Sequence, residues 1–200
     1  MSSNSISEHW STTRRLAQPV GYLEEAFERL IVAVEGVDAG ALADTPRRAA
    51  SAWRELMRGY GELPDLRTFD AEGFDEIIAV GRLPFYSTCE HHLLPFAGSA
   101  DFAYLPGARI LGLSKFARLL DHHSRRLQVQ ERLTQQLADT LDEALDPRGV
   151  MVVLRAEHFC MACRGVESPG HVTTTSVVRG RFKENPTTKA EAMGLLAQGR

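Results

Sequence analysis

The order of helix-like and strand-like segments most constrains how this chain can fold. Along its 200 residues, two helical segments precede two strand-like segments, two further helices, two further strands and a short C-terminal helix. Strands that follow one another directly pair as antiparallel hairpins, because a parallel pair needs a long crossover connection. The pattern therefore predicts an α+β fold built on an antiparallel sheet.

Apolar spacing and turn residues place the elements. The first helix is expected at residues 22–37 and ends near Gly36, and the second begins at Pro46 after a capping Asp44 or Thr45. A loop rich in Gly, Pro and Asp follows at residues 61–75, and the segment 95–98 is expected to break the strands. The later elements are expected as strands at 77–86 and 99–104, helices at 110–122 and 128–145, and strands at 150–160 and 172–182.

The helix at residues 128–145 has a leucine every fourth residue, at Leu133, Leu137, Leu141 and Leu145. A stripe of this kind lies on one face of a helix and is usually buried. We therefore assign these leucines to the hydrophobic core and not to a binding surface.

Composition excludes several classes of protein. The formal net charge is -3, so nothing global indicates binding to nucleic acid or to an anionic membrane. No apolar run reaches the roughly 18–20 residues that span a bilayer. The three cysteines form an odd, small set in a chain without a recognisable signal peptide, which argues against a disulfide framework and favours a cytoplasmic location.

Two clusters carry the candidate metal ligands. Cys89 and His92 are three residues apart in C-E-H-H, so a turn or helix brings both to one side. His158 and Cys160 are two residues apart, and a strand would direct both to one face. Thiolate and imidazole together are a donor set typical of tetrahedral zinc.

Two ligand sets are compatible with this spacing. In one, Cys89, His92, Cys160 and Cys163 close a structural Cys₃His site, using the C-x-x-C pair at residues 160–163. In the other, only the first three bind, and water in the fourth position is activated for catalysis. The histidines beside the ligands, His91 and His158, favour the open site, because a hydrolase needs proton donors and acceptors.

The chain resembles GTP cyclohydrolase I in several motifs that occur in the family's order. They are Y-S-T-C-E-H-H, G-L-S-K, R-R-L-Q-V-Q-E-R-L-T, H-F-C, R-G-V and V-T-T-T-S, between about residues 44 and 188. The resemblance implies a T-fold, in which an antiparallel sheet carries helices on one face. It further implies a homodecamer of two pentameric rings with active sites between subunits. On this basis we expect a flexible tail at residues 1–18, a helical segment at 19–62 and a T-fold catalytic domain at 63–200.

The implied reaction is hydrolysis of GTP to formate and 7,8-dihydroneopterin triphosphate, the first step toward folate or biopterin. The implied zinc ligands are Cys89, His92 and Cys160. His91 would protonate N7 of guanine before zinc-activated water attacks C8, and His158 would assist ring opening and loss of formate. Ser114 is expected to help protonate the sugar oxygen.

Recognition of GTP is also implied residue by residue. Glu131 resembles the family's guanine-binding carboxylate, which accepts hydrogen bonds from N1–H and the 2-amino group, and the adjacent Gln130 is expected to bind substrate too. The cations expected to bind the triphosphate are Arg48, Lys115, Arg118 and Arg164. They would supply locally the positive charge that the chain lacks globally.

Two positions depart from the family pattern. Cys163 stands where a non-ligand residue is more common, and Ser51 stands where some members have a phosphate-binding lysine.

Three other functions compete with the implied one: a scaffold with a closed zinc site, a related T-fold enzyme such as the deazaguanine nitrile reductase, and a cyclohydrolase that stops at an opened-ring formamide. The reductase uses a cysteine nucleophile and a nicotinamide cofactor without zinc, which fits the ligand clusters poorly.

Overall fold

The structure is a computed structural model that describes residues 20–36 and 40–198, so the predicted tail at residues 1–18 lies outside it. Its contacts divide the chain into two compact units, Met1–Glu62 and Leu63–Arg200. None of the described helices is both long and apolar enough to cross a bilayer.

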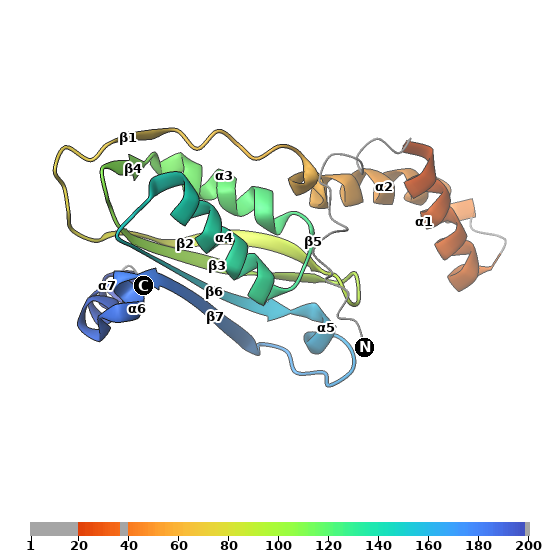
Figure 1. Ribbon diagram of the computed structural model, residues 1–200. Coiled ribbons are helices and arrows are strands. Elements are labelled where there is room, and N and C mark those ends of the chain that lie inside the picture. Colours follow the sequence, from red (N-terminus) through yellow and green to blue (C-terminus); the bar gives the residue numbers. More distant parts are fainter. Residues whose placement is uncertain (1–19, 37–39, 199–200) are drawn as a thin grey trace, which may run out of the picture. The chain divides into compact units, whose positions relative to one another are not determined.

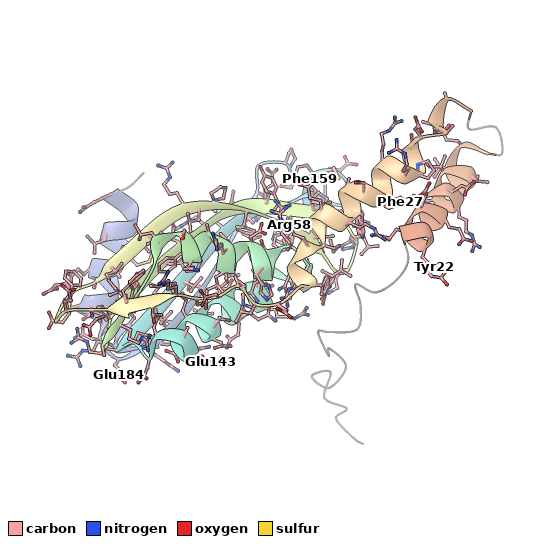
Figure 2. All side chains as sticks on the ribbon, turned by 90° about the horizontal axis from the view of Figure 1, so that it is seen from above. Tyr22, Phe27, Arg58, Glu143, Phe159 and Glu184 are labelled. Carbon is pink, nitrogen blue, oxygen red and sulfur yellow. The ribbon has the colours of Figure 1, made fainter. Side chains whose placement is uncertain are left out.

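The first unit is helical. Its elements are α1 (Val20–Glu35), the 3₁₀ turn η2 (Gly40–Leu42), α2 (Thr45–Leu56) and the 3₁₀ turn η3 (Arg58–Tyr60). Phe27 of α1 meets Trp53 of α2 edge to face with ring centroids 6.1 Å apart, whereas Tyr22 is largely exposed (Figure 2). This aromatic contact links the two helices.

The predicted ends of these helices are largely confirmed. Gly36 follows α1 with a φ of 86°, a left-handed conformation that glycine adopts without strain. Asp44 occupies the N-cap of α2 and Pro46 lies in its first turn, but no side chain makes the capping hydrogen bond that we expected.

The second unit is built on a five-stranded sheet with the order β5-β2-β3-β6-β7 (Figure 1). The strands are β2 (Ile78–Cys89), β3 (Pro95–Leu105), β5 (Leu127–Gln128), β6 (Gly149–His158) and β7 (Val172–Gly180). All neighbours are antiparallel except β2 and β5. A separate two-stranded sheet pairs β1 (Thr68–Asp70) with β4 (Arg109–Leu111).

Helices cover the sheet unequally (Figure 1). They are α3 (Leu113–Ser124), α4 (Gln130–Leu145), α5 (Phe159–Ala162), α6 (Arg181–Glu184) and α7 (Pro186–Gln198). The long helices α3 and α4 lie along one face, while α6 and α7 pack on the other face at the end of the sheet remote from α5. The predicted α+β class with antiparallel pairing is confirmed, and α6 and α7 add a partial second layer.

The main core lies between the sheet and the helices α3 and α4. Leu133, Leu137, Leu141 and Leu145 are at most 2% exposed, so the predicted burial of the leucine stripe is confirmed. They pack in one cluster with alternate residues of β3 and β6, among them Phe102. The core therefore holds α4 rigidly against the sheet.

Several predicted boundaries are wrong. The loop at 61–75 contains β1, and residues 109–111 form β4 instead of the start of α3, because these two segments pair only in the folded chain. The expected break at 95–98 is part of β3, where Pro95 takes the first strand position, which proline tolerates. A Cβ on Gly98 would lie 1.8 Å from the Arg155 carbonyl oxygen, so glycine there permits close approach of β3 and β6.

Candidate metal centre

Cys89 is the last residue of β2 and opens a tight turn into β3. Its amide donates to the Leu94 carbonyl at 2.8 Å, and its carbonyl accepts from the Leu93 amide at 2.8 Å. Leu93 has a φ of 56°, which this turn imposes on a non-glycine residue. The turn carries His92 and places its Nδ1 atom 3.8 Å from the Cys89 sulfur.

Cys160 reaches the same place from the far end of β6. We expected His158 and Cys160 to share one face of a strand, but β6 ends at His158 and Cys160 lies in the short helix α5. Pairing of Phe96 with His158 sets the start of β3 beside the end of β6. Hydrogen bonding across the sheet therefore brings together two ligand clusters that are about 70 residues apart.

The ligand atoms of Cys89, His92 and Cys160 all lie within 4.8 Å of one another. Burial raises the pKa of the Cys160 thiol, and the nearby Cys89 thiol adds to the effect, while Arg164 opposes it. Two thiols this close repel as thiolates unless a cation lies between them. Two sulfurs and one imidazole nitrogen at this spacing form a group that fits a tetrahedral metal ion with one position left open.

Cys163 has a different partner. It is exposed, and its thiol lies 3.0 Å from the Phe159 carbonyl oxygen, to which it donates a hydrogen bond within its own helical turn. All three cysteines are free. Among the described residues, Cys163 is not a member of the three-residue group.

His158 is held from two sides beside this group. Its ring stacks on Phe96 at 4.6 Å between centroids with an interplanar angle of 4°, and its Nε2 atom is 2.8 Å from Oε1 of Gln130. Burial lowers the pKa of His158, and the Glu131 carboxylate partly opposes that effect. The imidazole is thus orientated before any substrate arrives.

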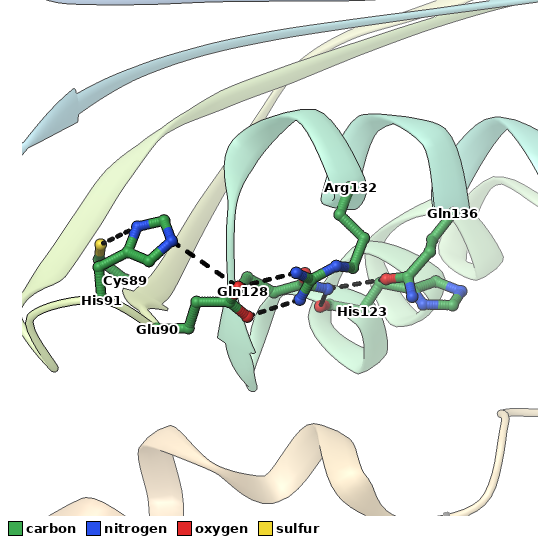
Figure 3. A network of polar contacts seen from close by, with 7 residues as sticks. All are labelled: Cys89, Glu90, His91, His123, Gln128, Arg132 and Gln136. Atoms are coloured by element: carbon green, nitrogen blue, oxygen red, sulfur yellow. Dashed lines mark hydrogen bonds and ion pairs between the residues drawn. The ribbon is translucent and has the colours of Figure 1, made fainter. Parts of the chain in front are cut away.

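His91 lies on the exposed side of the turn. Its Nδ1 atom is 3.9 Å from the Cys89 sulfur, and its Nε2 atom is 3.9 Å from the Glu90 carboxylate (Figure 3). Glu90 in turn accepts two hydrogen bonds from Arg132 of α4, which lower the pKa of the Glu90 carboxyl group. A chain of polar contacts therefore connects the candidate metal turn with α4.

The first turn of α4 carries Glu131, expected to bind guanine, and Gln130, expected to bind substrate. Glu131 is exposed, as a ligand-binding carboxylate must be, and it lies near enough to His158 to influence its pKa. Gln130 is only 1% exposed, and its amide is engaged by main-chain and side-chain groups of the protein. Glu131 is therefore accessible to a ligand, whereas the side chain of Gln130 is buried and hydrogen-bonded within the protein.

Three of the residues expected at the sugar and phosphates lie away from the candidate metal ligands of the same chain. Ser114, Lys115 and Arg118 follow β4, whose Leu111 amide donates to the Tyr104 hydroxyl at 3.1 Å. Tyr104 pairs with Ile78, at the opposite end of β2 from Cys89.

At about 3.3 Å per residue, the two ends of β2 are on the order of 30 Å apart. Lys115 instead lies 3.6 Å from the Asp65 carboxylate. Arg164 is exposed just after α5 and acts on the pKa of Cys160, so it lies on the metal side of the sheet. Arg48 belongs to α2 in the other unit, where it faces Asp44 at 3.7 Å.

Sequence reasoning missed several residues that build the site. Phe96 stacks on His158, Arg132 holds Glu90, and Thr175 contacts the Gln130 amide. No local pattern marks these residues, although Arg132 and Thr175 lie inside the motifs quoted above. Their roles depend on which strands become neighbours.

Comparison with known proteins agrees with the motif analysis. The family model for GTP cyclohydrolase I matches residues 23–197. GTP cyclohydrolase 1 of Mycobacterium ulcerans (strain Agy99) is 51% identical over 191 residues, covering 93% of this chain and 94% of that protein. The same enzyme of Mycobacterium leprae (strain Br4923) is 53% identical over 178 residues, covering 86% of this chain and 87% of that protein.

A third relative, GTP cyclohydrolase 1 of Mycobacterium tuberculosis (strain ATCC 25177 / H37Ra), is 52% identical over 178 residues and covers 86% of this chain and 88% of that protein. Among solved structures, the archaeosine synthase QueF-Like in the apo form aligns with a TM-score of 0.43 and 15% identity, over 54% of this chain and 96% of its own. Because the family model spans most of the chain and the curated relatives match nearly end to end, this protein belongs to the GTP cyclohydrolase I family.

Proposed function

We propose that this protein hydrolyses GTP to formate and 7,8-dihydroneopterin triphosphate, with Zn²⁺ held by Cys89, His92 and Cys160. The observation that carries the proposal is the convergence of these three ligand atoms within 4.8 Å, beside an orientated histidine. Zinc with three protein ligands acts as a Lewis acid and lowers the pKa of water in the fourth position to about 7. Family membership supports both the metal and the substrate.

The protein's own residues would perform the remaining chemistry. His91, exposed on the turn, would donate a proton to N7 of guanine, which makes C8 more electrophilic. His158, stacked on Phe96, would move protons during opening of the imidazole ring and release of formate. Ser114 would assist proton transfer to the sugar oxygen, as the family resemblance implies.

Guanine would be selected by Glu131. Its carboxylate is exposed in the first turn of α4, and one carboxylate accepts hydrogen bonds from both N1–H and the 2-amino group of guanine. Adenine lacks that pair of donors. The positive charges of Arg48, Lys115, Arg118 and Arg164 would bind the triphosphate.

We further propose that the active site is shared between subunits of a homodecamer made of two pentamers. Ser114, Lys115 and Arg118 lie toward the opposite end of the sheet from Cys89, so one chain does not surround a GTP molecule with both sets. A second copy would supply the missing set. A cytoplasmic location, expected from the free cysteines, is part of the same proposal.

The decisive experiment is incubation of zinc-loaded protein with GTP, with separate assays for formate and for the fluorescent pterin obtained after oxidation. We expect both products in equal amounts. Formate without pterin, or an opened-ring formamide, would indicate an enzyme that stops early. Absence of any GTP conversion by protein that holds one zinc per chain would refute the proposal and favour a scaffold.

Mixing two inactive variants tests whether the active site is shared between subunits. Glu131→Ala and Lys115→Ala subunits should each form inactive assemblies that still bind zinc. Mixed assemblies of the two variants should regain part of the activity, because some sites then combine an intact Glu131 with an intact Lys115. Light scattering should give the mass of ten chains, and fully active monomers would contradict the proposal.

A further inference from the structure

The side-chain amide of Gln130 is buried where α4 crosses β6 and β7. Its Nε2 atom lies 3.3 Å from the Leu154 carbonyl oxygen, 3.0 Å from the Thr173 carbonyl oxygen and 3.1 Å from the Thr175 hydroxyl. Its Oε1 atom lies 2.8 Å from Nε2 of His158. One side chain thus connects the end of the sheet with the imidazole beside the metal ligands.

The surroundings fix which way this amide faces. Carbonyl oxygens only accept hydrogen bonds, so the group that faces Leu154 and Thr173 must be the amide nitrogen. The flipped orientation would set an oxygen against two carbonyl oxygens in a site where Gln130 is 1% exposed. Buried polar groups left without hydrogen-bond partners lose their solvation with no compensation, which disfavours the flipped orientation.

A cycle of hydrogen bonds fixes the same orientation a second time. The Thr134 hydroxyl donates to the Gln130 main-chain carbonyl at 2.7 Å, which uses its only proton. The contact of 2.6 Å between the hydroxyls of Thr134 and Thr175 must therefore be donated by Thr175. Thr175 then accepts from Nε2 of Gln130, and the cycle closes on the residue from which it began.

The fixed orientation of the Gln130 amide determines which ring nitrogen of His158 carries the proton. Because Oε1 of Gln130 can only accept, the Nε2 atom of His158 must carry the proton in their 2.8 Å hydrogen bond. In the neutral imidazole the lone pair then belongs to Nδ1, which has no protein hydrogen-bond partner among the described residues. A half-turn of the ring would put a carbon in place of Nε2 at the Gln130 contact, and parallel stacking on Phe96 opposes that turn.

We propose that Gln130 is a positioning residue that holds neutral His158 in the Nε2–H tautomer, so that Nδ1 is the nitrogen that exchanges protons with substrate. This inference deepens the proposed function, on which its catalytic meaning rests. It also changes the part expected for Gln130 from the sequence. The Gln130 amide is engaged in hydrogen bonds within the protein. Gln130 therefore acts on the reaction through His158 instead of binding the guanine base.

The tautomer is measurable without GTP. Magic-angle-spinning NMR of sedimented, zinc-loaded protein with ¹⁵N-labelled histidine distinguishes a protonated ring nitrogen from one that bears a lone pair. The chain has seven histidines, and comparison with His158→Gln identifies the signals of His158. We expect a protonated Nε2 and an unprotonated Nδ1 in the natural sequence; the reverse assignment would overturn the proposal.

Variants test whether Gln130 is the cause. Gln130→Met has a similar length but no acceptor, so the Nε2–H preference should be lost and both tautomers should appear. If Gln130→Met does not fold, Gln130→Asn replaces it in the same measurement, because its side chain is one methylene shorter and moves the amide away from His158. Gln135→Met is the matched control, because Gln135 lies on the exposed side of α4, where its amide donates to the Asp139 carboxylate. An unchanged tautomer in the folded Gln130 variant would overturn the proposal.

Steady-state kinetics separate positioning from substrate binding. Gln130→Met should lower kcat by roughly 10- to 100-fold, as changes in groups that orientate a functional side chain do, while KM for GTP stays within about twofold. A large rise in KM with unchanged kcat would show contact with GTP and overturn the positioning role. If the natural sequence shows the Nε2–H tautomer but turns over no GTP, the orientating role of Gln130 stands and the proposed function fails.

Discussion

Arg132 donates two hydrogen bonds to Glu90, at 2.6 and 2.8 Å, and so fastens α4 to the turn that carries Cys89 and His92. A bidentate guanidinium–carboxylate pair fixes direction as well as distance. The Glu90 side chain is 24% exposed, so solvent screens the pair only in part. The turn that carries two of the three candidate ligands is thereby anchored to the helix that carries Glu131.

We predict that Glu90→Gln weakens zinc binding by roughly 10-fold, in the range typical of groups that orientate metal ligands. The amide keeps the size of the side chain but cannot accept two charge-assisted hydrogen bonds from Arg132. Competition with a chromophoric chelator measures the affinity. Glu143→Gln, at an exposed site farther along α4, is the control and should bind zinc like the natural sequence. Equal affinities for all three proteins would show that the ion pair has no part in holding the site.

The ligand set is tested by three serine substitutions. Cys89→Ser and Cys160→Ser should lose zinc affinity by more than the roughly 10- to 100-fold expected for outer groups, since each removes a donor sulfur. Cys163→Ser should bind zinc normally, because the Cys163 thiol faces the Phe159 carbonyl. Zinc titration of the three variants decides between an open and a closed site. A loss at Cys163 as large as that at Cys160 would establish the Cys₃His alternative.

Stability should fall in mild acid because of two histidines at the end of α3. Burial lowers the pKa of His123 to about 3 and that of His122 to about 4, and the nearby Arg126 strengthens both shifts. Below about pH 6.5 these two histidines bind protons in the unfolded chain but stay unprotonated in the folded chain until the pH is much lower. The free energy of unfolding is therefore at its full value above pH 6.5 and decreases toward pH 4, by up to roughly 1.4 kcal/mol per pH unit for each histidine.

Urea unfolding at about pH 7.5 and about pH 5, with protein and zinc concentrations held fixed, measures this loss. His123→Gln retains a side-chain donor near Thr140 but cannot titrate, so its stability should fall less between the two pH values. Only the difference between the two proteins is compared, since zinc binding is itself pH-dependent. Parallel losses in both would mean that His123 does not contribute.

Close packing of β3 against β6 predicts that alanine substitution has opposite effects on stability at Gly98 and at Gly194. Gly98→Ala should destabilise the fold by about 3 kcal/mol or more, because its Cβ would lie 1.8 Å from the Arg155 carbonyl oxygen and 2.7 Å from Cα of Ala156. Gly194 lies within α7, where an added Cβ would meet no described atom within 4 Å beyond its chain neighbours and its own helix backbone, so Gly194→Ala should stabilise by up to about 1 kcal/mol. Thermal unfolding compares them, and similar midpoints would contradict the packing argument.

The sequence alone determined the class of the fold and indicated the candidate metal ligands. Residues such as Cys89 and His92 are close together in the chain, and the leucine stripe of α4 repeats with the helical period, so both signals are local. Local signals survive folding because they depend on backbone geometry within a few residues. The family resemblance extended this reading to the reaction and to the proposed contact of Glu131 with guanine.

Tertiary structure decided which groups meet across long stretches of chain. The short strands β1 and β4 exist only because they pair with each other, and Gly98 marks a strand contact where the sequence suggested a break. Cys160 joins Cys89 through the pairing of β3 with β6, and Gln130 faces His158 through the crossing of α4 over β6 and β7. Such pairings depend on register and burial over the whole sheet, which no short segment of sequence contains.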